Sequence, residues 1–261
     1  MRSTLVLFFL VIPAILTGQK KPKNYYLKPG FLYSLNTIKD DGLSPVAYFG
    51  KMTGGNVDII ERTKTYDDIL SLSFVKGVLT PPFENTTQAD SWQIVIDWHH
   101  DFIFRSSEIS TSYLGWNFTC NYTEAKHNVY SNNPRKYTGF TAIGPSFKFD
   151  YNLPFGNDKV KLEFLATSSL LSYIIRPSVS AWEPIGYGDK VKNNSFELFA
   201  GGKIKTINKF QRIYTGVYMN YFLHDNFAFF ISYSWDFVHY KNEDELYNAK
   251  HNLIAGIFLK L

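Results

Sequence analysis

The chain has 261 residues, and its 27 Lys and Arg nearly balance its 23 Asp and Glu, which gives a formal net charge of +4. So small a surplus, spread evenly along the chain, argues against a nucleic-acid partner. Aromatic residues make up 18%, yet the mean hydropathy is only -0.17. Strands with one polar and one apolar face give this combination when Tyr and Trp collect at lipid headgroups.

The lone Cys120 excludes an internal disulfide. No cysteine framework is needed in a closed barrel, because its ring of strand pairs holds the chain together. No linker or repeat divides the sequence, and about 240 residues fit one large β domain.

The N-terminus has the parts of a secretory signal. Arg2 supplies the positive charge, Leu5 to Leu16 form the apolar core, and Thr17-Gly18 precede Gln19 as small residues for cleavage. That core is shorter than the roughly 20 residues of a spanning helix. We therefore expect residues 1–18 to be removed and residues 19–261 to form one domain. Loss of Arg2 leaves 26 Lys and Arg against 23 Asp and Glu, so the net charge becomes about +3.

The next part of the chain predicts strands, although its pattern is less regular. The predicted strands are Leu27–Ile38, Val46–Phe49, Val57–Thr65 and Asp68–Leu79. A clearer pattern follows, with one apolar face made of Trp92, Ile94, Ile96, Trp98, Phe102 and Phe104. The opposite face carries Gln93, Asp97, His99, Asp101 and Arg105. A break at Ser106–Glu108 then leads into a strand from Ile109 to Cys120.

The pair Thr138–Tyr151 and Lys159–Ile175 flanks a turn at Leu153–Asp158. Between them and the C-terminus, Ile213 to Tyr221 alternate in the same manner. A tight turn at His224–Asn226 leads into the most regular strand. Its apolar face consists of Phe227, Phe229, Ile231, Tyr233, Trp235 and Phe237.

The last strand, Asn248–Leu261, also alternates, with Leu253, Ala255, Ile257, Leu259 and Leu261 on one face. We interpret it as the strand that closes a transmembrane β-barrel. Bacterial barrels of this kind have an even number of strands, short periplasmic turns and longer outer loops. With Leu261 in the periplasm, the polar stretches Thr80–Ser91 and Asn121–Lys136 fall outside.

This topology is consistent only if Arg176–Lys209 is one long outer loop, with Ser195–Ile207 as a non-spanning hairpin or short helix inside it. Gly201, Gly202 and the charges of Lys203, Lys205 and the nearby Lys209 make that segment a poor lipid-facing strand. The sequence thus favours an all-β, antiparallel barrel of ten strands, with eight or twelve as alternatives. A soluble sandwich or lipocalin-like barrel is the other reading, but the Phe227–Phe237 face would then be an apolar patch in water.

The terminal strand resembles the C-terminal strand of bacterial outer-membrane proteins, with Leu261 where that family prefers an aromatic residue. The segments Gly42–Pro45 and Leu170–Pro177, with Gln19 after the signal, look similar to small uncharacterised barrels of Bacteroidota-type bacteria. This loose resemblance covers most of the mature chain. It implies an outer-membrane location with lipids as partners, and other outer-membrane proteins as further candidates, and it brings no catalytic motif.

Asp97, His99 and Asp101 are the best candidates for a site. Alternate residues of a strand point the same way, within about 7 Å of one another, so these groups could share protons or a cation. Facing them we expect Thr111, Tyr113 and Asn117, which offer hydroxyls but no serine beside His99. The competing interpretation is a structural network of buried charges with Arg105, Lys148, Asp150, Glu163 and Asp236 as available partners.

His100 points the opposite way and should face lipid unless a bulge turns it inward, in which case His99 and His100 with Asp97 or Asp101 could bind a metal. No second cluster supports such a site, so no metal or other cofactor is predicted. Among the tryptophans only Trp182, in the long loop, is free to bind a ligand. Loop lysines, namely Lys190, Lys192, Lys203, Lys205 and Lys209, could contact lipopolysaccharide phosphates.

The sequence therefore favours a non-enzymatic barrel, either a structural or partner-binding wall protein or a narrow channel for small solutes. At ten strands, side chains should fill most of the lumen, so a wide porin is not expected. The alternative function is a membrane-embedded lipid hydrolase, a phospholipase or lipid A deacylase, that uses the Asp97, His99 and Asp101 cluster.

Overall fold

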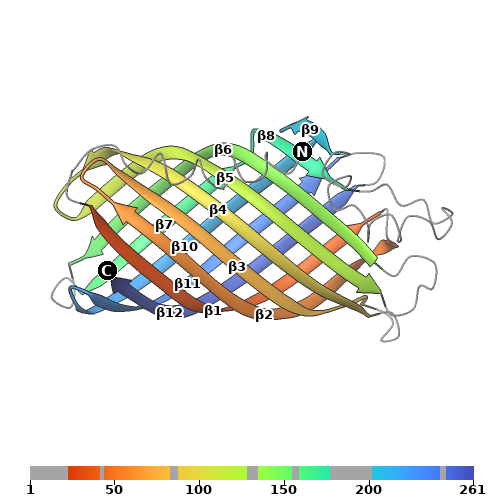
Figure 1. Ribbon diagram of the computed structural model, residues 1–261, viewed down its shortest axis with the longest axis horizontal. Coiled ribbons are helices and arrows are strands. Elements are labelled where there is room, and N and C mark those ends of the chain that lie inside the picture. The colour runs from red at the N-terminus through yellow and green to blue at the C-terminus, as the bar shows by residue number, and fades with distance from the viewer. Residues whose placement is uncertain are drawn as a thin grey trace, which may run out of the picture.

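The computed structural model describes residues 23–41, 44–82, 88–127, 135–154, 159–176, 202–241 and 245–261. The expected signal peptide, residues 1–18, lies outside this part of the chain. Ten long strands form a closed antiparallel barrel, and two short strands are added at one end (Figure 1). No helix among the described residues is long and apolar enough to cross a membrane.

The strands of the barrel follow one another around the ring in chain order. They are β1 (Asn24–Asp40), β2 (Ser44–Arg62), β3 (Tyr66–Thr80), β4 (Ala89–Ser106), β5 (Ser110–His127), β6 (Arg135–Leu153), β7 (Val160–Ser168), β10 (Phe210–His224), β11 (Phe227–Tyr240) and β12 (Leu246–Lys260). The short additional strands are β8 (Leu171–Ile175) and β9 (Lys203–Thr206). The prediction of ten spanning strands is confirmed.

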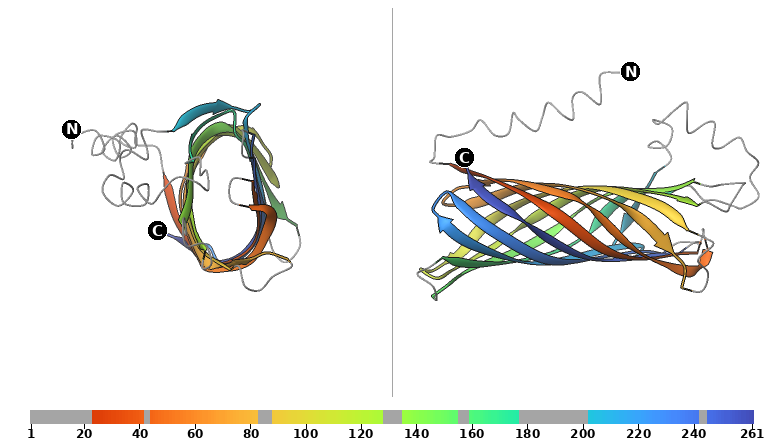
Figure 2. Two further views of the ribbon diagram at one scale, coloured as in Figure 1. Left: turned by 90° about the vertical axis from the view of Figure 1, so that its right-hand side faces the viewer. Right: turned by 90° about the horizontal axis from the view of Figure 1, so that it is seen from below.

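Pairing of the first strand with the last closes the ring. β1 and β12 are paired from Tyr26 opposite Lys260 to Asp40 opposite Leu246. Seen along its axis, the barrel is a closed oval ring, and in side view its strands are strongly tilted (Figure 2). The predicted role of the C-terminal strand is therefore confirmed, with Leu246–Lys260 as its observed bounds.

The two ends of the barrel differ in their connections. At one end, which we call the turn end, lie the links after β2, β4, β6 and β10, the first residues of β1 and the last of β12. The side chain of Thr63 fixes one of these turns, because its hydroxyl oxygen accepts the backbone N–H of Tyr66 at 3.0 Å. Ser107 acts in the same way on Ser110 at 3.1 Å. The opposite end, with the links after β1, β3, β5, β8 and β11, is the loop end.

Three predicted boundaries were wrong. β2 is one continuous strand where the sequence suggested two, because Gly50, Gly54 and Gly55 keep extended backbone inside it. β5 continues to His127 and β6 begins at Arg135, so the polar stretch Asn121–Lys136 belongs largely to strands. Polar residues such as the buried Asn121 face the lumen here, and a lumen-facing polar residue does not end a barrel strand.

The predicted strand Lys159–Ile175 is divided into β7 and β8, which pair in turn with the two halves of β6. The division falls at Ser169, whose N–H donates to the Arg212 carbonyl at 2.9 Å and whose Oγ accepts the Arg212 N–H at 2.8 Å. Residues 207–209 form a turn between β9 and β10. Because of this turn, β9 pairs with β8 while β10 pairs with β7. Of the predicted inner hairpin at Ser195–Ile207, residues 195–201 lie outside the described residues, and the rest contributes β9.

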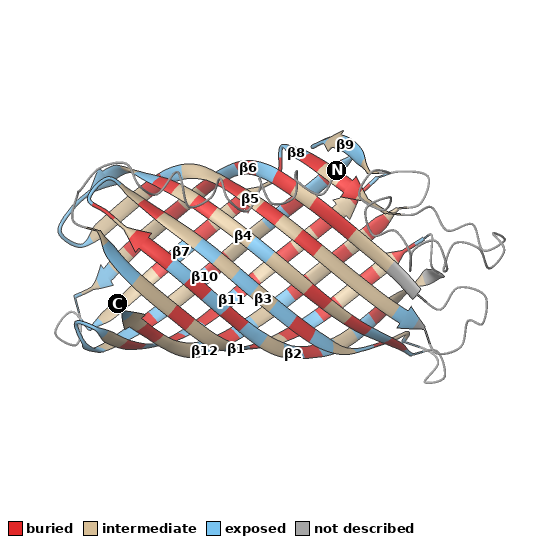
Figure 3. Cartoon of the chain, in the orientation of Figure 1, coloured by how far each residue is buried: buried red, intermediate tan, exposed pale blue. Residues whose placement is uncertain are grey.

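Burial alternates along nearly every strand, as the chequered pattern of Figure 3 shows. On β11, for example, Ala228, Phe230, Ser232, Ser234 and Asp236 are buried in the lumen, while Phe229, Ile231 and Tyr233 are exposed on the outside. The predicted outer face from Phe227 to Phe237 is therefore confirmed. An all-antiparallel closed barrel with an apolar exterior is the architecture of bacterial outer-membrane proteins, and an outer-membrane location follows from it.

The lumen has three layers. Charged residues predominate at the turn end, beside a small apolar cluster of Ile60, Ala228 and Phe258. Charged and polar residues line much of a central cavity, beside a second apolar cluster that includes Leu32, Met52 and Phe230, and a larger apolar group fills the loop end. We call the last group the apolar collar. It consists of Ile38, Tyr48, Leu79, Ala89, Phe140, Ala142, Ile174, Phe210, Val238, Tyr240 and Leu246, with Ala125 packed against it.

Candidate functional site in the barrel lumen

Asp97, His99 and Asp101 lie on the inner face of β4, as the alternation predicts. His99 and Asp101 are buried, and the Asp97 side chain is 15% exposed. The structure nevertheless separates the three. Asp97 and His99 line the central cavity, whereas Asp101 lies nearer the turn end and outside the cavity lining.

Asp97 is held by an arginine from the far side of the ring. The guanidinium of Arg212 on β10 donates from Nη1 to Asp97 Oδ1 at 2.8 Å and from Nη2 to Oδ2 at 3.2 Å. The same guanidinium binds Asp236 on β11, from Nε at 2.9 Å and from Nη2 at 3.2 Å. Lys250 Nζ lies 3.4 Å from Asp236. We call these four residues the Arg212 crossbar.

The hydroxyl of Thr119 donates to Asp97 and also lies against Arg212. Both oxygens of the Asp97 carboxylate are thus occupied by a cation, and one also accepts the hydroxyl. A carboxylate in a bidentate pair with arginine is a poor proton acceptor, because the pair stabilises its ionised form. This geometry fits the predicted structural network of charges.

His99 has a different environment. Its ring is buried between Ile69 on β3 and Asn117 on β5, the residues that stand opposite it in the two strand pairs. Its Nδ1 has no hydrogen-bond partner among the described residues. Asn117 instead donates to Thr119 at 2.9 Å. Unlike Asp97, His99 therefore keeps a polar atom available beside the cavity.

Asp101 lies beside a second network, but neither of its carboxylate oxygens has a hydrogen-bond partner among the described residues. We call this network the turn-end cluster, and it consists of Lys28, Arg62, Asp67, Lys148, Asp150, Lys161 and Glu163. Asp101 stands directly opposite Asp67 in the β3–β4 pair. Asp67 binds Lys148 and, at 3.0 Å, Arg62. The predicted partners Lys148, Asp150 and Glu163 are thus part of one network, and Asp236 is part of the other.

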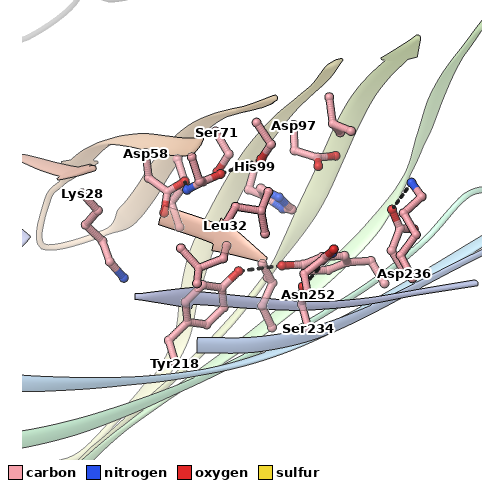
Figure 4. Close-up of a pocket in the computed structure, with 18 of the residues that line it drawn as sticks. Lys28, Leu32, Asp58, Ser71, Asp97, His99, Tyr218, Ser234, Asp236 and Asn252 are labelled. Atoms are coloured by element: carbon pink, nitrogen blue, oxygen red, sulfur yellow. Dashed lines mark hydrogen bonds and ion pairs between the residues drawn. The ribbon is translucent and has the colours of Figure 1, made fainter. Parts of the chain in front are cut away.

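The central cavity between the two networks has a volume of about 80 Å³, counted as the space that the centre of a water molecule can occupy. At about 10–15 Å³ of such space per molecule, it holds roughly six waters. Figure 4 shows Lys28, Asp58, His99, Tyr218 and Asp236 around it. Four basic side chains in its lining, Lys28, Lys148, Arg212 and Lys250, balance four acidic ones, Asp58, Asp97, Glu163 and Asp236.

His100 faces outward without any bulge, so it cannot share a metal ion with His99. Its Nδ1 lies 2.5 Å from Asp68 Oδ1 on β3, and both side chains are about one-fifth exposed. Rings of Tyr66, Trp98, Phe102 and Trp116 surround the His100 ring. Within the described residues, no group of three or more His, Cys, Asp and Glu is placed to hold a metal ion.

Arg105 was wrongly predicted to face the lumen. A register shift between Ile103 and Arg105 reverses the alternation near the end of β4, and Arg105 is exposed. The predictions for Tyr113 and Asn117 hold, because both are buried on the inner face of β5. Tyr113 donates its hydroxyl to Asp150 at 3.1 Å.

Only some of the loop residues that were predicted to contact ligands or lipopolysaccharide lie in the described part of the chain. Trp182, Lys190 and Lys192 lie outside the described residues. Lys203 and Lys209 are exposed and Lys205 is partly exposed, all at the loop end.

Sequence reasoning missed the residues that cross the lumen, above all Arg212, Lys250, Arg62 and Asp67. Alternation contained the signal for the first two. Arg212 has the same parity as Tyr214 and Gly216, and Lys250 the same parity as Asn252, so both had to point inward. Their partners could not be read in this way, because alternation gives the face of a residue and not its neighbours across the lumen.

Comparison with known proteins gives similarity at the level of the fold. No protein-family model matches the sequence, and no curated protein matches it either. Among solved structures, the outer-membrane protease OmpT of Escherichia coli is similar with a TM-score of 0.52 and 10% identity, over 91% of this chain and 97% of that one.

Two further outer-membrane proteins are similar at lower scores. Neisserial surface protein A has a TM-score of 0.41 and 11% identity, over 92% of this chain and all of that one. OprG of Pseudomonas aeruginosa has a TM-score of 0.35 and 10% identity, over 92% of this chain and 97% of that one. The closed antiparallel barrel and its likeness to OmpT give the chain the fold of a bacterial outer-membrane β-barrel, and the likeness extends to the fold alone.

Proposed function

We propose that the chain is a non-enzymatic structural protein of the outer membrane. Its barrel has a closed lumen, and its loop end binds partners. The observation that carries this proposal is the Arg212 crossbar. A single guanidinium joins Asp97 on β4 to Asp236 on β11, with four charge-assisted bonds of 2.8–3.2 Å. Arg212 is 3% exposed, so its guanidinium is buried inside the lumen, where it spans from one side of the ring to the other.

Two other layers support the same proposal. At the turn end, Arg62 reaches across to Asp150 at 3.8 Å and Lys148 to Asp67. At the loop end, Arg176 beside β8 binds Asp40 on β1 and lies over the ring of Tyr240, against the apolar collar. Hydrated ions would have to displace both charge networks and pass a constriction that apolar side chains keep dry.

Recordings from planar bilayers test the closed lumen. We expect no steady conductance from the purified wild-type protein, and measurable conductance from Arg62→Gln/Lys148→Met/Arg212→Gln, which removes the bridging cations of both networks. Arg105→Gln, on an exposed arginine, is the matched control and should stay closed. A wild-type protein that conducts steadily would instead support the narrow channel for small solutes.

A second candidate function, lipid hydrolysis, rests on the available Nδ1 of His99. Asp97 is engaged by Arg212, so a hydrolase would have to use His99 with Asp101. It would release fatty acid from phospholipid or lipid A, and His99→Ala would abolish the release while His99→Gln would not restore it. Absence of release from the wild-type protein, or equal release from His99→Ala, excludes this function.

Lipids of the outer membrane and neighbouring outer-membrane proteins are the partners that this proposal implies. The sequence resemblance supports a Bacteroidota-type bacterium as the source. Gentle solubilisation tests the protein partner. Co-purification of a second outer-membrane protein in a defined ratio supports it, and a protein found only as a monomer counts against it.

A further inference from the structure

A second cavity lies at the loop end, separated from the central cavity by the Arg212 crossbar. Its volume is about 50 Å³, again as the space open to the centre of a water molecule. We call it the mouth pocket. Eight of its lining residues are apolar and belong to the collar or pack against it, namely Ile38, Tyr48, Leu79, Ala89, Ala125, Phe140, Val238 and Leu246.

An apolar lining is unusual in this position. The lumen of a transmembrane barrel is normally polar, because water or polar groups occupy it. In this chain the largest apolar cluster of the lumen lies at the loop end, where side chains from nearly all strands of the barrel contribute to it, and packing of the barrel against lipid does not require it. Such a surface is stable when it meets other apolar groups, whether its own or those of a ligand.

The lining also contains polar groups whose hydrogen bonds are not all made. Asn121 and Asn248 are buried, and neither Asn121 Nδ2 nor Asn248 Oδ1 has a hydrogen-bond partner among the described residues. Asn121 uses its other atom, Oδ1, to accept from Thr123 at 3.1 Å. One free donor and one free acceptor thus stand beside the pocket, and the soft terminal torsion of asparagine lets each amide turn toward an occupant.

An unmade hydrogen bond in a buried place is costly, and an occupant that supplies it gains specificity as well as affinity. The size of the pocket limits that occupant. At about 10–15 Å³ per water, 50 Å³ corresponds to roughly four waters, the volume of about six to eight carbon and oxygen atoms. Among the described residues, the lining contains one charged side chain, Asp40, which is paired with Arg176, so the described part of the lining does not favour a charged ligand.

We propose that the mouth pocket is a binding site for a small, neutral, mostly apolar molecule with one hydroxyl group, of the phenol class. Its ring lies against the collar, and its hydroxyl donates to Asn248 Oδ1 and accepts from Asn121 Nδ2. The site does not depend on whether the lumen conducts, so it stands apart from the proposed function of the barrel.

Fluorine NMR with 4-fluorophenol tests the site in full-length protein held in amphipol, so that no detergent micelle competes for the probe. We expect saturable binding to the wild-type protein. Ala125→Phe, which fills the pocket from its rim, should weaken binding at least tenfold. The matched control is Ala255→Phe, the same change at an exposed position on the outside of β12, and it should bind as the wild type does.

A variant with unchanged pocket volume keeps the test independent of folding. Asn121→Leu retains the shape and removes the donor, so we expect binding weaker by about three- to tenfold. Fluorobenzene, which has no hydroxyl, should bind wild type and Asn121→Leu equally. The proposal is overturned if 4-fluorophenol fails to saturate, or if Ala125→Phe, shown to be folded by its heat-dependent migration on a gel, binds as tightly as Ala255→Phe.

Discussion

Arg212 is the residue on which most of the lumen depends. Its planar guanidinium has enough donors to bind two carboxylates at once, which a lysine ammonium could not do with the same geometry. Asp97 depends on it for its counter-charge, and Asp236 shares it with Lys250. The alternation of β4 predicted correctly that Asp97 faces the lumen, yet no local pattern could name a partner that lies 115 residues away.

Arg212→Ala should therefore be strongly destabilising. It leaves Asp97 without its cation and Asp236 with Lys250 alone, and breaking a buried ion pair costs about 3–5 kcal/mol. We expect the free energy of unfolding in urea, measured in lipid vesicles, to fall by about 3 kcal/mol. Arg105→Ala, at an exposed arginine, should change it by less than about 0.5 kcal/mol. Equal losses of unfolding free energy in the two variants would show that Arg212 stabilises the barrel no more than an exposed arginine does.

His100 and Asp68 raise a different problem, because they form a hydrogen-bonded polar pair on the outer wall of the barrel. Charge on the lipid face of a barrel is unfavourable, and the ring of Tyr66, Trp98, Phe102 and Trp116 reduces the contact of this pair with lipid. Alternation predicted the outward direction of His100. It did not predict Asp68, because that residue reads as the polar start of a strand.

His100→Ala alone should cost about 2 kcal/mol, since it leaves Asp68 uncompensated beside lipid. The double variant Asp68→Leu/His100→Leu should recover that loss or exceed the wild-type stability, because two apolar residues suit this face. Urea unfolding of the single and double variants gives the comparison. A double variant less stable than His100→Ala would mean that the pair of His100 and Asp68 contributes net stability to the barrel.

At the scale of elements, the strands with regular alternation were predicted well and the irregular ones were not. β11 and β12 follow period two over their whole length, so their faces and their pairing could be read directly. β2 could not, since Gly50, Gly54 and Gly55 interrupt its side-chain pattern while the backbone continues. β8 and β9 depend on a turn at residues 207–209 that shifts pairing between two neighbouring strands, and such a shift has no signature in either strand alone.

Gly54 shows what those glycines do. A Cβ atom at this position would lie 1.8 Å from the carbonyl oxygen of Phe74, so the β2 and β3 backbones approach too closely for any side chain. At the adjacent Gly55, the nearest atom to a Cβ would be 3.7 Å away, which is ordinary contact. The close approach of β2 and β3 thus depends on one of the two glycines.

We therefore expect Gly54→Ala to destabilise the barrel by about 1–3 kcal/mol, as forced overpacking does. Gly55→Ala is a matched control, because it makes the same substitution one residue further on and should be nearly neutral. Unfolding of the two variants in urea measures the difference. If both lose the same stability, glycine entropy and not close approach explains the effect.

At the scale of the whole molecule, closure of β1 on β12 gives the barrel two distinct ends. The turns at Thr63, Ser107 and Asp225 share one end with the last residues of β12, as an even number of antiparallel strands requires. Ring closure and strand number could therefore be predicted from the sequence. The layered lumen could not, because it depends on which inward residues from opposite sides of the ring meet at one height.

Labelling of single cysteines tests the orientation of these ends. In a Cys120→Ser background, Lys241→Cys at the loop end should react with an impermeant maleimide on intact cells. Asn226→Cys, in the turn between β10 and β11, should react only after the outer membrane is made permeable. The reverse pattern would place the loop end in the periplasm and contradict the proposed surface for partners.

The Arg212 crossbar also affects how the barrel unfolds. Arg212 and Asp97 are 115 residues apart, and Arg176 and Asp40 are 136 apart, so each bond closes a long loop of chain that contains several strands. Contacts of such long range contribute late in assembly, after the entropy of closing the chain has been lost. Interactions that are absent from the transition state slow unfolding and leave the folding rate almost unchanged. The ions inside this barrel therefore act on its lifetime in the membrane, and much less on the speed with which it is built.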